Sequence, residues 1–128
     1  MKKIILILLC LLSLNSIYAG LNVKRKRIFH CRNFDHITMV EELFILESKL
    51  GRNIFYEVEV PYNNGQDQVF FRKLNLIKTH GARVLSFTTG NYRVKIDRAM
   101  PVKKKYKTFV RLPKFGIHST KWFCKDYL

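Results

Sequence analysis

The sequence predicts an α+β domain, in which one N-terminal α-helix packs on an antiparallel β-sheet. Three observations predict this class. An apolar run in the first half of the chain has a helical period, the segments after it have the patterns and turn residues of strands, and Cys31 and Cys124 lie on either side of these elements. We therefore also expect a disulfide that joins the two ends of the domain.

Residues 1–19 have the three parts of a secretory signal peptide. Two lysines follow the initial methionine, an apolar run extends to Leu14, and Ala19 and Gly20 form a small-residue cleavage site. The apolar run is shorter than the roughly 18–20 residues that a membrane-spanning helix needs, although a short membrane anchor is an alternative. We expect a secreted protein with no transmembrane segment, whose mature part, residues 20–128, is a single domain.

Two cysteines remain after Cys10 leaves with the signal peptide. An even pair in an oxidising compartment favours a disulfide over a metal site or a catalytic thiol, so we predict a bond between Cys31 and Cys124. A closed loop of roughly 90 residues would stabilise the fold by about 4–5 kcal/mol in the chain-entropy account.

The chain is strongly basic, with a formal net charge of +15. Such a charge argues for a polyanionic partner, such as nucleic acid or an anionic membrane surface. The alternative is a secreted domain whose basic faces are only solvated, and net charge alone does not distinguish the two. The first basic cluster, residues 24–27, is interpreted as an electrostatic arm or a frayed terminus, with a dibasic processing site as the third alternative.

The helix is predicted over Asp35–Leu50. Residues 38–41 fit a capping box, and Gly51 is placed where a glycine commonly ends a helix. Apolar residues recur at a 4-3-4 spacing along one face: Met39, Leu43, Leu46 and Leu50. We expect Leu43 and Leu46 to be buried against the sheet.

The sheet is predicted to hold four or five antiparallel strands. Asn63-Asn64-Gly65 predicts a turn, and Gly90-Asn91 predicts a tight hairpin because both residues tolerate positive φ. The strand segments are residues 54–60, 69–76, 84–88, 92–97, 106–112 and 119–124.

With these elements in place, the mature chain resembles the RNase-like proteins associated with haustoria, a group of candidate secreted effectors of powdery-mildew fungi. The resemblance is carried by the signal peptide, the aromatic-x-Cys triplet Phe29-His30-Cys31, the order of the elements and the C-terminal cysteine. It implies a fold similar to the guanyl-specific microbial ribonucleases. Two short stretches add to it: residues 62–64 resemble a turn of those enzymes, and residues 81–84 resemble the segment that holds their phosphate-binding arginine.

The resemblance also implies where catalytic residues would lie. Those ribonucleases use a glutamate base, a histidine acid and an arginine that holds the phosphate. Arg83 matches the arginine, but the glutamate position falls near Phe71 and Arg72, and neither candidate strand for the acid, residues 92–97 or 109–112, contains a histidine. We therefore expect no catalytic residues and no enzyme activity. A rearranged site is the alternative, with these members: Glu57, Glu59 and His118.

No metal or cofactor site is predicted. His30, His36 and His80 lack metal-ligand spacing with other His, Cys or Asp residues, and the sequence has no glycine-rich phosphate loop.

The second half of the chain is basic and carries aromatic residues between its cations. Such a surface suits RNA, because cations neutralise phosphates and aromatic rings stack on unpaired bases. The alternative interpretation makes Phe109 part of the core and the lysine run a solvated loop. The predicted nucleic-acid-binding residues are Arg83, Arg93, Lys95, Lys103, Lys104, Lys105, Lys107 and Arg111.

These expectations describe a secreted, basic, monomeric protein that acts by binding. The resemblance adds that it is a virulence effector, translocated into the host plant cell, where it binds host RNA or host proteins, suppresses immunity and is open to recognition by a host immune receptor. Two other classes remain as alternatives: an active secreted ribonuclease and a basic antimicrobial or membrane-active protein.

Overall fold

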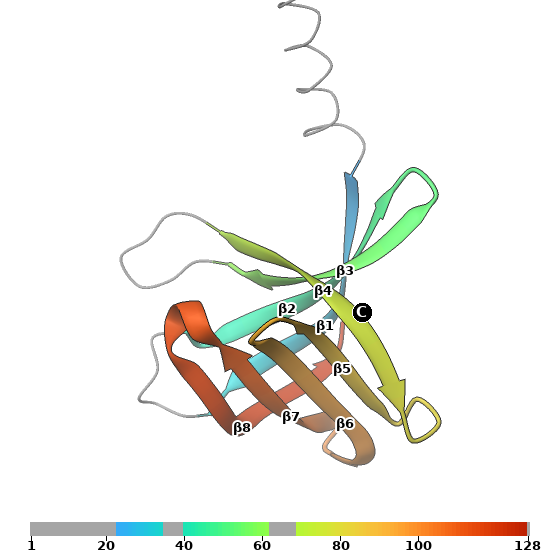
Figure 1. Ribbon diagram of the computed structural model, residues 1–128. Helices are drawn as coiled ribbons and strands as arrows, with labels where there is room; N and C mark the ends of the chain where they lie inside the picture. Colours follow the sequence, from blue (N-terminus) through green and yellow to red (C-terminus); the bar gives the residue numbers. More distant parts are fainter. Residues whose placement is uncertain (1–22, 35–39, 62–68, 128) are drawn as a thin grey trace, which may run out of the picture.

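The protein is a closed barrel of eight antiparallel strands. The computed structural model describes residues 23–34, 40–61 and 69–127, and in these residues each strand pairs with its neighbours along the chain (Figure 1). Pairing of the last strand with the first closes the barrel. The strands are β1 (Val23–Asn33), β2 (Glu42–Leu50), β3 (Asn53–Val60), β4 (Phe70–Thr79), β5 (Val84–Thr89), β6 (Tyr92–Val102), β7 (Lys105–Leu112) and β8 (Ile117–Asp126), with a 3-10 turn, η1 (Pro113–Phe115), before β8.

The predicted α+β fold, with an N-terminal helix packed on a sheet as in microbial ribonucleases, is therefore wrong. Of the predicted helix, residues 35–39 lie outside the described residues, and residues 42–50 are strand β2. The predicted burial of Leu43 and Leu46 is confirmed, but the two side chains lie on opposite faces of that strand.

Burial on both faces explains why β2 has the pattern of a helix. Leu43 and Ile45 belong to the core inside the barrel, whereas Phe44 and Leu46 are buried on its outer side. The Arg27 guanidinium covers Phe44 at 3.8 Å from the ring centroid. A strand covered on both faces carries a continuous apolar run, and its period alone cannot be distinguished from that of a short helix.

Gly51 ends a strand and not a helix. It is the first of the two residues that join Leu50 to Asn53, and its φ of +62° fits the first central position of a type II′ hairpin turn. The hairpin predicted at Gly90-Asn91 is confirmed, with Gly90 at a φ of +54° and Thr89 paired with Tyr92.

Residues 24–27, expected as an arm or a frayed terminus, form part of β1 and pair with the end of β2. After a register shift between Arg27 and Phe29, the strand continues between β2 and β8. The start of β1 and the β2–β3 hairpin project beyond the barrel wall (Figure 1). The six strand segments predicted from residue 54 onwards correspond to β3–β8, whereas β1 and β2 were not recognised as strands. The expected total of four or five strands is therefore too low, because all six segments and these two strands belong to the sheet.

Alternation along the strands fills the barrel with side chains. On β6, Val94 and Ile96 are fully buried, whereas Arg93 and Lys95 are exposed. Trp122 and Phe87 are the largest fully buried side chains of the core. An eight-stranded barrel is just wide enough for side chains to fill it, so most polar side chains of the strands lie on its outer surface. Thr108 is an exception, because it is buried and lies opposite the core residues Ile96 and Trp122.

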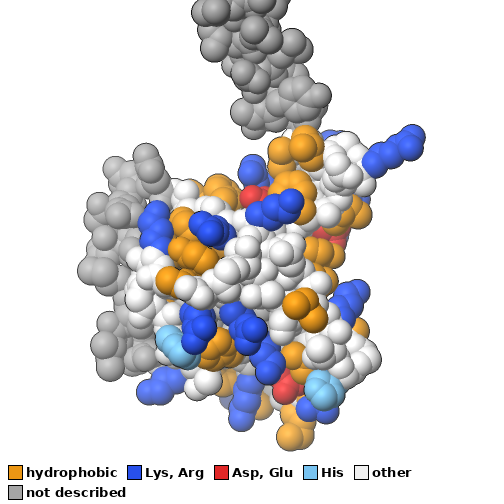
Figure 2. All heavy atoms as spheres, viewed as in Figure 1, with side chains coloured by type: hydrophobic (Ala, Val, Ile, Leu, Met, Phe, Trp, Pro, Cys, Tyr) orange, Lys and Arg blue, Asp and Glu red, His pale blue; other side chains and the backbone are white. Residues whose placement is uncertain are grey.

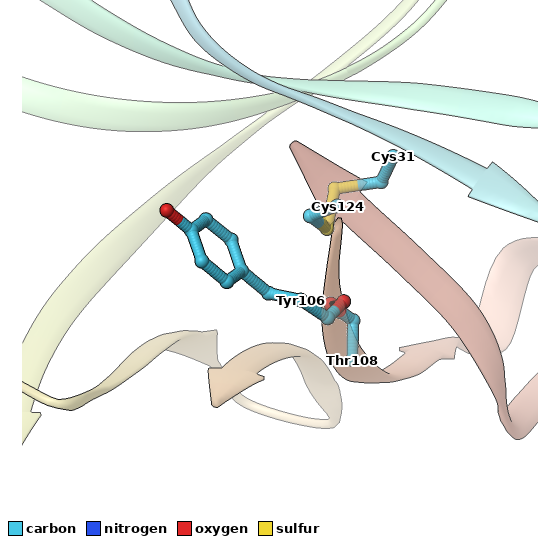
Figure 3. Close-up of a disulfide and its surroundings, with 4 residues drawn as sticks. All are labelled: Cys31, Tyr106, Thr108 and Cys124. Atoms are coloured by element: carbon cyan, nitrogen blue, oxygen red, sulfur yellow. Dashed lines mark hydrogen bonds between the residues drawn. A yellow bond between two sulfur atoms is a disulfide. The ribbon is translucent and has the colours of Figure 1, made fainter. Parts of the chain in front are cut away.

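The predicted disulfide is confirmed. Cys31 on β1 and Cys124 on β8 lie directly opposite each other and are bonded across 93 residues of sequence (Figure 3). Phe29 and Cys31 face the core while His30 between them faces outwards, so the aromatic-x-Cys triplet is one inward-outward-inward step of a strand. Beside the bond, the Tyr106 hydroxyl donates to Asp126 at 2.9 Å, which raises the pKa of Tyr106.

Candidate functional site

The outer face of the β6–β7 pair brings together four of the predicted RNA-binding cations. Arg93 on β6 lies opposite Arg111 on β7, and Lys95 lies opposite Phe109. Lys107 lies opposite Asp97, one step further along the same face. Because directly opposed residues of an antiparallel pair point to the same side, these side chains share one exposed surface.

This surface continues across β8 and onto β1. Phe123 on β8 lies between Lys107 of β7 and Arg32 of β1, and Lys125 lies opposite His30. Figure 2 shows Lys and Arg side chains over the part of the molecule formed by β6, β7 and β8, with hydrophobic atoms between them. We call this outer surface the basic face; its cations are Arg32, Arg93, Lys95, Lys105, Lys107, Arg111 and Lys125.

The cations of the basic face outnumber the carboxylates beside them, which are Asp97 opposite Lys107 and Glu42 opposite Arg32. All seven are exposed, and within the described part of the chain none of them belongs to an ion pair. Aromatic rings lie among them: Phe109 contacts His118 edge-to-face at 5.1 Å between centroids, and Phe123 contacts Phe34 in the same way at 5.3 Å. The arrangement can therefore offer both positive charge and ring faces to a ligand.

The remaining predicted cations lie at the edges of this surface. Lys103 and Lys104 form the exposed turn between β6 and β7, with φ values of +53° and +64°. Arg83, just before β5, donates to Asp97 at 3.4 Å, so its charge is partly compensated. The pKa of Asp97 is lowered, first by the hydrogen bond from the Ala99 backbone N–H and then by Arg83.

Sequence analysis missed the contribution of β1 and β8. It treated His30 only as part of a motif, and it did not select Arg32, Phe123 or Lys125. The signal was present, because His30 and Arg32 flank Cys31 at the spacing of two, which places them on the face opposite the cysteine. It was not used, because no strand was predicted around Cys31.

The alternative ribonuclease site is not assembled. Glu57 accepts hydrogen bonds from Arg25 at 3.0 Å and from the buried Ser48 hydroxyl at 2.7 Å, and Glu59 accepts from Arg27 at 2.9 Å. These carboxylates lie on β3, whereas His118 lies on β8, and β1 and β2 separate the two strands. The bond to Glu59 raises the pKa of Arg27.

Comparison of the chain with protein-family models, with curated proteins and with solved structures gave no match. In the part of the chain that the structure describes, no helix is long and apolar enough to cross a membrane. The same residues contain no cluster of three or more His, Cys, Asp or Glu side chains that would hold a metal ion.

Proposed function

We propose that this protein binds single-stranded RNA through the basic face. The observation that carries the proposal is the cross-strand register, which gathers seven exposed cations and two aromatic residues, Phe109 and Phe123, onto the outside of β6, β7, β8 and β1. Phosphates would lie against the cations, and unpaired bases would stack on the rings. Because side chains fill the barrel, the outer surface is the part available to a ligand of this size.

We also propose that the protein is secreted. It is supported by the signal-peptide pattern of residues 1–19 and by the disulfide between Cys31 and Cys124, a bond typical of oxidising compartments. The fold that the fungal resemblance implied is wrong, and the other implications of that resemblance, which are action in a host plant cell, a host protein partner and recognition by an immune receptor, stay predictions.

The test is RNA binding by the purified mature protein over a range of salt concentrations. We expect the affinity for a short labelled polyadenylate to fall steeply with salt, with a log–log slope of about −0.7 for each phosphate contact. In the variant R93E/R111E, two facing cations become two facing carboxylates. The affinity should fall at least about tenfold and the slope should become shallower.

The matched control is K49E/R52E, which changes the net charge equally. Lys49 and Arg52 are exposed near the β2–β3 turn, away from the basic face. If both variants lose the same affinity, only the total charge of the protein matters and the basic face is not a site. Binding that is insensitive to salt would contradict the proposal and favour a protein partner.

A further inference from the structure

A small pocket lies at one end of the basic face, where β8 closes the barrel against β1. Its volume is about 70 Å³, whereas a cavity of roughly 10–15 Å³ on the same measure is enough to hold one water molecule. We call it the seam pocket. Its lining comes from β1, the residue after β1, the start of β7 and β8, and consists of His30, Arg32, Phe34, Lys105, Phe123 and Lys125.

The charge of the seam pocket fits an anion. Three of its six lining side chains, those of Arg32, Lys105 and Lys125, are cations, and none is a carboxylate. The nearby carboxylate of Glu42 accepts a hydrogen bond from His30 at 2.8 Å, and the His30 ring stacks on Phe44 at 4.6 Å between centroids. These contacts position the imidazole on the pocket wall.

The aromatic part of the pocket fits a planar group. Phe34 is 49% exposed, although it is a large apolar side chain. One side of it contacts Phe123 edge-to-face, and the Lys105 ammonium lies 5.4 Å from its centroid. An exposed ring held beside three cations is the combination that binds a nucleobase together with its phosphate, because stacking and charge neutralisation then act on adjacent parts of one ligand.

We propose that the seam pocket binds one phosphorylated nucleotide unit, with the phosphate at Arg32, Lys105 and Lys125 and the base on Phe34. This inference deepens the proposed RNA-binding function, since it names a subsite on the basic face. What distinguishes this subsite is that it would hold the phosphate and the base of one nucleotide together.

In the first test, the mature protein is titrated separately with adenosine 5′-monophosphate, adenosine and inorganic phosphate at constant ionic strength. Binding is measured from the shifts of the backbone amide NMR signals. We expect the nucleotide to shift amide signals of residues 30–34 and 123–125, and to bind more tightly than either adenosine or phosphate. Equal binding of the nucleotide and phosphate would overturn the proposal, because it would show an anion site with no base contact. Shifts confined to other strands would overturn it as well.

Two variants with matched controls test the residues. Phe34→Ala should weaken nucleotide binding at least about fivefold. Its control is Phe71→Ala, which removes another exposed phenylalanine, one that lies beneath Arg25, and should leave nucleotide binding unchanged. Lys105→Gln should weaken it more than Lys104→Gln, which removes the same charge from the adjacent turn. A nucleotide affinity unchanged by both pocket variants would refute the assignment.

The outcome separates this inference from the proposed function. With polyadenylate, Phe34→Ala should lower the affinity without changing the salt slope, because stacking releases no counterions. If polyadenylate binds and depends on Arg93 and Arg111 while the nucleotide gives no shifts at the seam pocket, the subsite is wrong and RNA binding stands. If the nucleotide binds there and polyadenylate does not bind, the reverse holds.

Discussion

Loss of the disulfide should destabilise the barrel more than any single surface change. The bond joins Cys31 and Cys124 across 93 residues, so in the chain-entropy account its removal costs about 4.6 kcal/mol. Both cysteines are fully buried, and replacement by alanine also removes two sulfur atoms from the core. Proteins of this size have a free energy of unfolding of roughly 5–15 kcal/mol, so the variant should retain only a fraction of its stability.

The expected fall in the melting temperature follows from the unfolding entropy. At about 2.1 cal/mol/K per residue, a chain of this length unfolds with an entropy near 0.2 kcal/mol/K, so the loss corresponds to about 20 °C. Thermal unfolding of C31A/C124A should be monitored by circular dichroism. Reductant should lower the melting temperature of the natural protein to a similar value and leave the variant unchanged.

A fall of less than about 5 °C would refute this reasoning. It would mean that the unfolded chain has nearly the same conformational entropy with and without the disulfide. One cause would be that β1 and β8 remain associated in the unfolded state. The five paired positions between β1 and β8 would then be enough to close the barrel.

Two further changes test local features of the barrel. Replacing the turn Lys103-Lys104 by Asn-Gly should stabilise the protein by about 1 kcal/mol in urea unfolding, because both residues have positive φ and this pair suits a type I′ turn. The charge-matched control is K107N/K125N, which also removes two exposed lysines, and an unchanged midpoint of the turn variant would contradict the expectation. Arg27→Ala should lower the free energy of unfolding by about 1–2 kcal/mol, because it breaks a partly exposed ion pair with Glu59 and uncovers Phe44. Lys26→Ala, at an exposed neighbour, is the control and should cost much less. Equal losses would show that the contacts of Arg27 contribute little.

The success and failure of the sequence predictions have a physical cause. Strand β5 and the first half of β6 were predicted closely, because their polar and apolar residues largely alternate and because Gly90 marks the turn between them. The continuation of β6 to Val102 was not predicted. Strand β2 was predicted as a helix because Phe44 and Leu46 are buried on the outside of the barrel, where Arg27 of β1 covers Phe44. No pattern within β2 itself indicates that a side chain of the neighbouring strand covers its outer face.

The candidate site, too, was predictable from the sequence only in part. Local sequence identified the cations of β6 and β7, since alternation alone assigns Arg93 and Lys95 to a common face. The seam pocket was not predictable in this way, because its residues come from β1, β7 and β8, which are neighbours only after the barrel closes.

By itself, then, the sequence determined the basic charge, the strands from β3 onwards and the pairing of Cys31 with Cys124, because each depends on composition or on residues close along the chain. Only the tertiary structure decided that residues 42–50 are a strand, that the sheet closes on itself, and that Arg32 and Lys125 join the cations of β6 and β7. The reason is that closure is set by the pairing of β1 with β8, whose residues are far apart in sequence and acquire a common face only when they meet.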